Sequence, residues 1–192
     1  REHLAKLAQR AIATSELFDQ FARVDRIPRL SNGDRENDVE HSFLLATIAT
    51  DLAQELRPDL DVNRIRQFSL VHDMLEIKTG DVATFSTSPE EQAEKERREK
   101  EALDELLAEL PPLEAETLRE YEKQDTPEAR WTRYVDKMLA TLVDITGQGV
   151  RVVEEDFGVT SLEKLCDEHG RLATKYHNMF GNEFPELDQL YA

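Results

Sequence analysis

The sequence predicts an all-α protein, because its apolar residues recur at spacings of three and four along most of the chain. Only seven Gly and seven Pro occur in 192 residues. Alternating runs of Val, Ile, Thr and aromatic residues, which are typical of strands, are missing. No internal repeat or low-complexity linker divides the chain, so we expect one helical domain over residues 1–192.

The first half of the chain predicts three helical regions. Apolar residues spaced along residues 4–21 indicate an N-terminal helix or helix pair. A second helix is expected from about residue 38 until Pro58 stops it. A third is expected over residues 62–78, because Gly80 follows at a position where helices commonly end.

The second half predicts four more helices and a strongly acidic segment. Residues 90–122 carry 13 acidic against five basic side chains, which indicates a solvated helical face and leaves open a lid over a site. Pro111-Pro112 divides this segment into two helices, and Thr126-Pro127 is a typical start for the next. Thr160 and Glu163 have the spacing of a capping box and predict the start of the last long helix.

Charge and composition exclude several classes of function. The 24 Lys and Arg against 41 Asp and Glu give a net charge of −17, which argues against binding a nucleic-acid polymer. No apolar run approaches the roughly 20 residues of a membrane helix. The single cysteine, Cys166, excludes an internal disulfide, fits a reducing compartment and lies on an apolar stripe that predicts a core position. Because no signal peptide is visible, we expect a cytoplasmic protein.

Histidines and carboxylates on apolar helix faces are the first sign of chemistry. His41 and His72 fall on the predicted buried stripes of two helices, where a lone histidine is more often a core residue than a ligand. Asp73 changes this balance, because a buried carboxylate costs several kcal/mol unless it is paired or binds a metal. Asp136 lies in a third apolar context, with Lys137 as an alternative partner. Two imidazoles and two carboxylates on three helices suit a divalent ion of borderline hardness.

These residues carry a resemblance to a known family. In order along the chain, His41, His72-Asp73 and Asp136 resemble the H…HD…D signature of the HD-domain metal-dependent phosphohydrolases. The stretch LVHDMLEIKTGD at residues 70–81 resembles the LxHDxxExxxGD stretch of the subgroup that includes bacterial 5'-deoxyribonucleotidases. The stretch ENDVEHS at residues 36–42 resembles the ENVxEHS-like stretch of the same subgroup.

Weaker similarity widens the part of the chain that the resemblance covers. Residues 96–101 and 121–130 also look like this subgroup, so the motif-bearing core spans about residues 20–145. Residues 150–192 add no matching motif and are expected to form a C-terminal helical extension. The resemblance implies a single HD-domain helical bundle.

The resemblance also implies roles for individual residues. His41, His72, Asp73 and Asp136 would ligate one divalent ion, whose identity among Mn, Co, Zn, Fe and Mg stays open. Two carboxylates would be catalytic. Glu76 lies one helical turn after His72 and would act on the water or on a proton, and Asp81 would act beside the phosphate or the sugar. The structural alternatives are an exposed helix acid for Glu76 and a turn or cap residue for Asp81.

Two residues are expected to contact the substrate. Arg26 lies 15 residues before His41 and matches the position of the phosphate-binding arginine of the subgroup. Ile27 departs from the pattern, because the bacterial deoxyribonucleotidases carry an aromatic residue there that disfavours a 2'-hydroxyl. We therefore expect weak discrimination between ribose and deoxyribose.

The sequence thus predicts an enzyme that hydrolyses a nucleoside 5'-monophosphate to nucleoside and phosphate, by attack of a metal-bound water on phosphorus. Hydrolysis of a nucleoside triphosphate or another small phosphoester is the close alternative. An oxygenase with two irons would need further histidines, and none lies between His72 and His169. A nucleotide-binding regulator would be expected to have lost ligands, and the set here is complete. The expected partner is a small phosphorylated metabolite, with no nucleic-acid polymer and no membrane, and both monomer and homodimer stay open.

Overall fold

The computed structural model describes residues 1–80 and 89–191, and for residues 89–96 it describes the backbone alone. The described chain is mainly helical and contains one two-stranded hairpin, which confirms the predicted all-α class. The elements are, in order, α1 (Glu2–Phe21), β1 (Asp25–Arg29), β2 (Arg35–Asn37), α2 (Asp38–Leu56), α3 (Val62–Val71), α4 (Glu76–Thr79), α5 (Pro89–Glu109), α6 (Pro112–Lys123), α7 (Pro127–Thr146), α8 (Gly149–Arg151), the π-helical segment η1 (Val152–Asp156), α9 (Leu162–Tyr176), the π-helical segment η2 (His177–Gly181) and α10 (Pro185–Tyr191).

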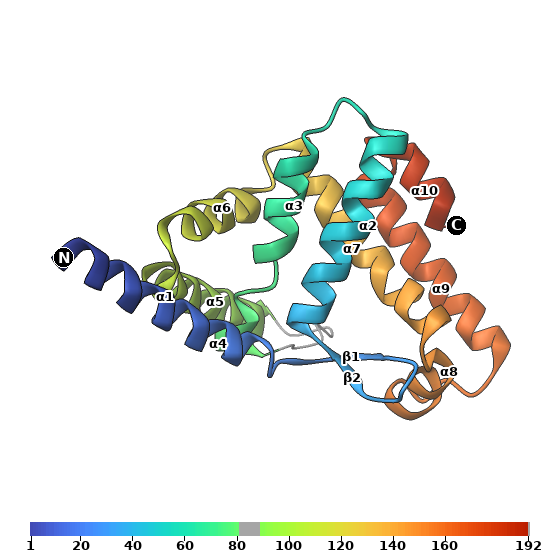
Figure 1. Cartoon of the computed structure of the whole chain (residues 1–192). Helices are drawn as coiled ribbons and strands as arrows, with labels where there is room; N and C mark the ends of the chain where they lie inside the picture. Colours follow the sequence, from blue (N-terminus) through green and yellow to red (C-terminus); the bar gives the residue numbers. More distant parts are fainter. Residues whose placement is uncertain (81–88, 192) are drawn as a thin grey trace.

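Helices α2, α3 and α7 pack against one another and form the main core (Figure 1). Trp131 of α7 is fully buried, and its indole Nε1 donates a hydrogen bond to the carbonyl of Ala49 in α2 at 2.9 Å. The C-terminal segment closes this core, since Phe184 packs edge-on against Trp131 with ring centroids 5.3 Å apart. This packing fixes α7 against α2, and therefore places Asp136 relative to His41.

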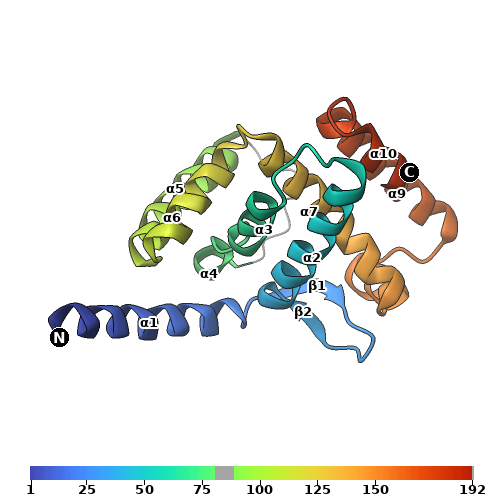
Figure 2. The ribbon, with the colours of Figure 1, turned by 45° about the horizontal axis from the view of Figure 1, so that its top comes forward.

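A second apolar cluster joins the end of α1 to α5 and α6. Its buried members are Leu17, Phe21, Val71, Met74, Leu106, Leu110, Ala115 and Leu118. The N-terminal part of α1 extends away from the other helices (Figure 2), and Leu4 and Ile12 are exposed. The region predicted as a helix or helix pair is therefore one helix, anchored only by its C-terminal end.

The start of α2 is defined by a capping box. The side chain of Asn37 accepts hydrogen bonds from the backbone N–H groups of Val39 and Glu40, at 3.0 and 3.1 Å. In return, the Glu40 carboxylate accepts a hydrogen bond from the Asn37 backbone N–H at 3.1 Å. These bonds satisfy backbone donors that a helix start leaves unpaired. They place His41 in the first turn of α2, with its side chain facing the core.

The third predicted helix is broken in the structure. Instead of one helix over residues 62–78, α3 ends at Val71, residues 72–75 form turns, and a short helix α4 follows. The apolar spacing carries on through the break, because Met74 faces the second apolar cluster, so periodicity alone predicts a continuous helix. The break lets His72 and Asp73 project together toward α2 and α7. The predicted stop at Gly80 is confirmed, since this residue has a φ of 69°.

A hairpin that the sequence analysis did not predict connects α1 to α2. Strands β1 and β2 pair antiparallel, with an irregular register between Asp25 and Arg29 (Figure 1). The strands have only five and three residues, which is too short to give a periodic signal. The hairpin rests on the end of α7, where the Gln148 N–H donates a hydrogen bond to the Arg29 carbonyl at 3.1 Å.

Most predicted helix boundaries in the second half are confirmed. The prolines at 111–112 separate α5 from α6, and the Thr126 hydroxyl caps α7 by accepting a hydrogen bond from the Ala129 N–H at 3.2 Å. The cap of α9 is Ser161 and not Thr160, because the Ser161 hydroxyl accepts from the Lys164 N–H.

The expected core position of Cys166 is wrong, since α9 leaves it exposed. None of the described helices is long and apolar enough to cross a membrane.

The junction of α7 and β1 predicts a sensitive glycine. A Cβ at Gly147 would overlap the backbone carbonyl of Arg29, whereas a Cβ at Gly170 in α9 would meet no atom within 4 Å. We therefore expect Gly147→Ala to lower the free energy of unfolding by about 1–3 kcal/mol. Gly170→Ala, the matched control, should raise it by about 0.5–1 kcal/mol, because alanine loses less backbone entropy in a helix. Urea denaturation of both variants measures this, and a fully stable Gly147→Ala would contradict the close approach.

Candidate metal centre

Four of the predicted site residues meet where α2, α7 and the turn after α3 come together. One ligand atom from each of His41, His72, Asp73 and Asp136 lies within 4.8 Å of the others. His41 Nε2 is 3.0 Å from Asp136 Oδ1, and His72 Nε2 is 2.9 Å from Asp73 Oδ2. The two imidazole ring centroids are 5.2 Å apart. The expected convergence of these four side chains is thus present in the structure.

The orientation of His72 is set by the backbone of α3. Its Nδ1 lies 2.8 Å from the carbonyl oxygen of Ser69, and a carbonyl can only accept a hydrogen bond. Nδ1 therefore carries the proton, and Nε2 faces the carboxylates of Asp73 and Asp136. This is the arrangement in which a second hydrogen bond fixes the tautomer of a metal-binding histidine.

The two buried carboxylates are kept ionised by surrounding cations. Burial by itself raises the pKa of Asp136, but the ammonium of Lys137 and the two adjacent histidines hold that pKa well below its usual range. Lys137 Nζ donates to Asp136 Oδ2 at 2.7 Å. Burial likewise raises the pKa of Asp73, while the charges of His72 and Arg26 outweigh it and lower that pKa. The predicted partner Lys137 is therefore present, and it occupies the Asp136 oxygen that does not face the histidines.

Arg26 lies next to this group of four, as its predicted role requires. Its Nη1 donates hydrogen bonds to Asp73 Oδ2 at 2.5 Å and to Asp38 Oδ1 at 3.1 Å. The carboxylates of Asp73 and Asp136 more than offset the cost of burying the guanidinium, so the pKa of Arg26 is raised and it stays charged. The guanidinium is held in place by carboxylates before any anionic ligand arrives.

Two buried acids at this site were not singled out from the sequence. Glu36 and Asp38 flank Asn37 at the junction of β2 and α2, and both are almost fully buried. Burial and the nearby charge of Asp73 raise the pKa of Asp38 to about 6, although Arg26 opposes this shift. Both residues fall in the stretch 36–42 that carried part of the family resemblance. Glu36 lies in a strand of three residues and Asp38 at the first position of α2, where no periodic signal exists, so their burial could not be predicted from spacing.

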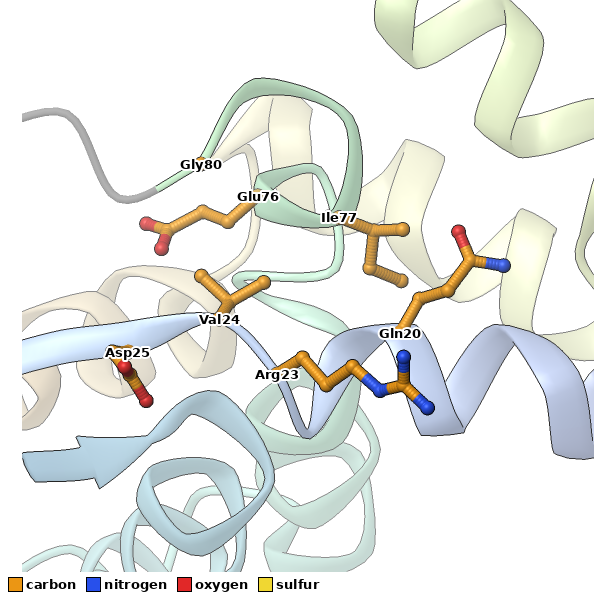
Figure 3. Close-up of a pocket in the computed structure, with 7 residues that line it drawn as sticks. All are labelled: Gln20, Arg23, Val24, Asp25, Glu76, Ile77 and Gly80. Carbon is orange, nitrogen blue, oxygen red and sulfur yellow. The ribbon is translucent and has the colours of Figure 1, made fainter.

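Glu76 lines a cavity whose wall contains none of the four candidate ligands. This cavity has a volume of about 480 Å³, and its wall is formed by the end of α1, the start of β1 and α4, through Gln20, Arg23, Val24, Asp25, Glu76, Ile77 and Gly80. Figure 3 shows the Glu76 and Ile77 side chains leaving α4 in opposite directions, with Glu76 above Val24 and Asp25. The charge of Glu76 contributes to the raised pKa of Arg26, which places the two groups near each other.

Two predicted site residues remain, Ile27 and Asp81, and the structure describes the first of them. Ile27 follows Arg26 in β1 and is half-buried, and its carbonyl accepts a hydrogen bond from Arg35 Nη1 at 3.0 Å. Asp81 lies outside the described residues. Its predicted role therefore stays a prediction.

The donor set fits a divalent metal ion. Two imidazole nitrogens and two carboxylate oxygens face one point, and His72 Nε2 is a buried atom without a hydrogen bond of good geometry among the described residues. Two carboxylates held together in the interior require positive charge between them. Imidazole with carboxylate suits Mn, Fe, Co or Zn better than Ca. Among the described residues, these four form the single group of this kind.

Comparison with known proteins agrees with this geometry. The model of the HD domain family matches residues 18–175. The chain belongs to the HD domain family. This result confirms the predicted helical HD-domain fold, and the four candidate ligands and Arg26 all lie inside the matched region.

Individual relatives of the chain are enzymes named for one reaction. It is 32% identical over 187 residues to the 5'-deoxynucleotidase HDDC2 of Homo sapiens, covering 90% of this chain and 82% of that protein. It is 29% identical over 143 residues to the 5'-deoxynucleotidase hdd1 of Schizosaccharomyces pombe, covering 68% and 70%. A crystal structure described as a predicted metal-dependent phosphohydrolase from Magnetospirillum magnetotacticum MS-1 matches with a TM-score of 0.69 and 26% identity, over 96% of this chain and 92% of that one.

The charge of His72 predicts how the stability of the metal-free protein depends on pH. Burial lowers the pKa of His72, but the charges of Asp73 and Asp136 outweigh burial and raise it to about 10, compared with about 6.5 in an unfolded chain. The protonated form is therefore favoured in the folded state. Its contribution to stability is complete below about pH 6.5 and is lost as the pH rises toward about 10.

After treatment with a chelator, we expect the Tm of the wild type to fall by several degrees between pH 7 and pH 9.5. In His72→Gln, which has no titrating group at this position, the fall should be clearly smaller. Thermal unfolding followed by circular dichroism measures both. Parallel curves for the two proteins would show that His72 is not protonated in the metal-free fold.

Proposed function

We propose that this protein is a metal-dependent 5'-nucleotidase that hydrolyses a nucleoside 5'-monophosphate to nucleoside and phosphate. The observation that carries this proposal is the contact of Arg26 with Asp73 inside the group of four ligand side chains. A phosphate bound by Arg26 would therefore lie directly beside the metal position. The names of the relatives, which are 5'-deoxynucleotidases, support a nucleoside monophosphate as the substrate.

The residues that would hold the ion are His41, His72, Asp73 and Asp136. When bound, a divalent ion supplies a Lewis acid that polarises the phosphoryl group and lowers the pKa of a coordinated water. The four protein ligands leave coordination positions for water and a phosphate oxygen. The identity of the ion among Mn, Co, Zn, Fe and Mg is a matter for measurement, and the borderline donor set favours the first four.

Arg26 binds and orients the phosphate. Nη1 is occupied by Asp73 and Asp38, whereas no described residue pairs with Nη2. The guanidinium therefore presents Nη2 to the substrate, where it can donate hydrogen bonds to phosphate oxygens and stabilise the charge that develops on them. The local positive charge of Arg26 also offsets the −17 net charge of the chain, which repels an anionic substrate.

Glu76 is the proposed proton acceptor for the attacking water. It lies at the start of α4, four residues after His72 along the chain, and lines the cavity between α1, β1 and α4. The proton that the water loses would go to the Glu76 carboxylate, and the protonated Glu76 could then give it to the leaving 5'-oxygen of the nucleoside. Asp81, just beyond the described residues, is proposed to act beside the phosphate or the sugar, as the sequence indicates. We further propose that residues 1–192 form one HD domain, with 150–192 as a helical extension.

A panel of substrates tests the function. The chelator-treated enzyme is incubated with ribo- and deoxyribonucleoside 5'-monophosphates, 3'-monophosphates and 5'-triphosphates, with Mn²⁺, Co²⁺, Zn²⁺, Fe²⁺ or Mg²⁺, and phosphate release is measured. We expect release from 5'-monophosphates only when a metal is present, and none with the ligand variant Asp73→Ala. Preferential hydrolysis of triphosphates, or no hydrolysis with any metal, would overturn the proposal.

Replacing the proposed proton acceptor separates chemistry from metal binding. Glu76→Gln keeps the shape of the side chain and removes its charge, so we expect kcat to fall by about 10²-fold or more while metal content is unchanged. Steady-state kinetics and elemental analysis measure the two quantities. The control is Glu116→Gln on the exposed face of α6, which should keep wild-type turnover. Unchanged turnover in Glu76→Gln would assign Glu76 to the surface of the cavity without a catalytic role.

The sugar preference is predicted from Ile27. An apolar pocket rejects an added hydroxyl by only about 10²-fold even when it fits well. Without an aromatic ring at this position, we expect kcat/KM for a ribonucleoside 5'-monophosphate to lie within about tenfold of the deoxy form. Ile27→Trp should shift the ratio toward the deoxy substrate, whereas the control Ile27→Val should not. A wild-type enzyme that strongly rejects ribonucleotides would show that another residue selects the sugar.

A further inference from the structure

Glu36 is a buried acid that contacts two of the proposed functional groups at once. It lies in β2 with 1% of its surface exposed. Its Oε2 is 3.3 Å from Nδ1 of His41 and 3.7 Å from Nε of Arg26. One carboxylate oxygen therefore lies between an imidazole that faces the metal position and the guanidinium that faces the phosphate position.

The hydrogen-bonding state of these atoms supports a direct connection. Glu36 Oε2, His41 Nδ1 and Arg26 Nε are all buried, and none has a hydrogen bond of good geometry within the described chain. Leaving such groups unpaired costs about 1–3 kcal/mol each, so buried polar atoms are rarely left so. The Glu36 oxygen is near both nitrogens, and a shift of about half an ångström would bring it within hydrogen-bond distance of both.

The consequence for His41 follows from its two ring nitrogens. Without an ion, Nε2 of His41 donates to Asp136 Oδ1 at 3.0 Å, because a carboxylate can only accept. With an ion on Nε2, the ring proton has to sit on Nδ1, where the Glu36 carboxylate can accept it. His72 is oriented in the same way, but by the neutral carbonyl of Ser69. A carboxylate on the far nitrogen makes an imidazole a more basic ligand than a carbonyl does.

The consequence for Arg26 follows from its fixed planar geometry. Asp73 and Asp38 take Nη1, and Glu36 lies nearest to Nε. Contacts at Nε and at Nη1 together restrict rotation of the guanidinium plane. The remaining nitrogen, Nη2, then keeps one direction, which we assign to the phosphate position.

We propose that Glu36 is a positioning residue that aligns His41 for the metal ion and Arg26 for the phosphate. This inference rests on the proposed function for the identity of the two ligands, a divalent ion and a phosphate group. It assigns Glu36 no contact with either. It predicts that one substitution in the hairpin weakens both binding steps, although they involve different side chains.

The test measures binding of the two ligands without turnover. Wild type and Glu36→Gln are titrated with Co²⁺ after chelator treatment, and the Co²⁺-loaded proteins are then titrated with inorganic phosphate. An amide oxygen is an uncharged and weaker acceptor than a carboxylate oxygen, so it holds the two N–H groups less firmly, and we expect the Co²⁺ affinity to fall by about 10–100-fold. The phosphate affinity of the Co²⁺-saturated variant should also fall, because Nη2 of Arg26 is less well directed.

Asp144→Asn is the matched control for charge. Burial, together with the nearby charge of Glu36, raises the pKa of Asp144 to about 6, yet Asp144 has no hydrogen bond or ion pair with His41 or Arg26 in the described structure. This variant removes negative charge from the same region without touching the two N–H groups. We expect near-wild-type affinity for both ligands, whereas an equal loss in Asp144→Asn would show that charge alone, not positioning, explains the effect.

A second variant keeps the proposal testable if Glu36→Gln folds poorly. Glu36→Asp retains the charge but shortens the side chain by one methylene, which moves the carboxylate away from Nδ1 and Nε. It should lose affinity for both ligands as well, and thermal unfolding monitors the fold. Wild-type Co²⁺ and phosphate affinities in folded Glu36→Gln or Glu36→Asp would overturn the inference. A wild type that binds both ligands but releases no phosphate from nucleotides would instead overturn the proposed function alone.

Discussion

The burial of two carboxylates at one point is the constraint around which the rest of the structure is arranged. Asp73 and Asp136 are brought together in the interior from segments far apart in the sequence, and each would cost several kcal/mol without positive charge nearby. In the described chain that charge comes from three elements: Arg26 on β1, Lys137 on α7 and the protonated His72 after α3. The hairpin, the end of α3 and α7 must therefore meet at this point, and a divalent ion would take over the role of the proton on His72.

The chain as a whole is strongly negative, whereas the proposed phosphate position next to Arg26 is locally positive. The chain carries a net charge of −17, and an acidic segment contributes nearly half of it. A phosphorylated substrate is repelled by such a field, so attraction has to be local. Arg26 provides this local attraction. Asp38 and Asp73 keep its guanidinium charged and in place. Binding then requires little reordering of a long side chain, which reduces its entropic cost.

The sequence predicted the side chains of the site that have metal-binding chemistry. It did not predict the helix break and the hairpin, which depend on the path of the backbone. The convergence of His41, Asp73 and Asp136 could be predicted because these residues match the metal-binding signature of the HD-domain family; their place on apolar helix faces alone did not decide between ligand and core roles. The break after Val71 could not be predicted, since Met74 continues the apolar spacing into the second cluster. The hairpin could not either, because strands of five and three residues give no periodicity. Cys166 was misplaced for the opposite reason. The amphipathic face of α9 is clear in the sequence, but in the described chain it is its later part, at Ala173 and Tyr176, that packs against the main core, and Cys166 is exposed.

The segment from Glu36 to His41 shows how a local motif can determine a site that is otherwise assembled over long range. Asn37 ends β2 and caps α2 with the help of Glu40, so the path of the backbone between Glu36 and His41 is fixed by bonds within six residues. That path places the Glu36 carboxylate behind the His41 ring while Nε2 meets Asp136, a residue 95 positions later in the chain. The orientation of one candidate ligand therefore depends on local hydrogen bonds as well as on long-range contacts. The capping box thus acts on the metal centre through the helix start, although none of its hydrogen bonds reaches the ion.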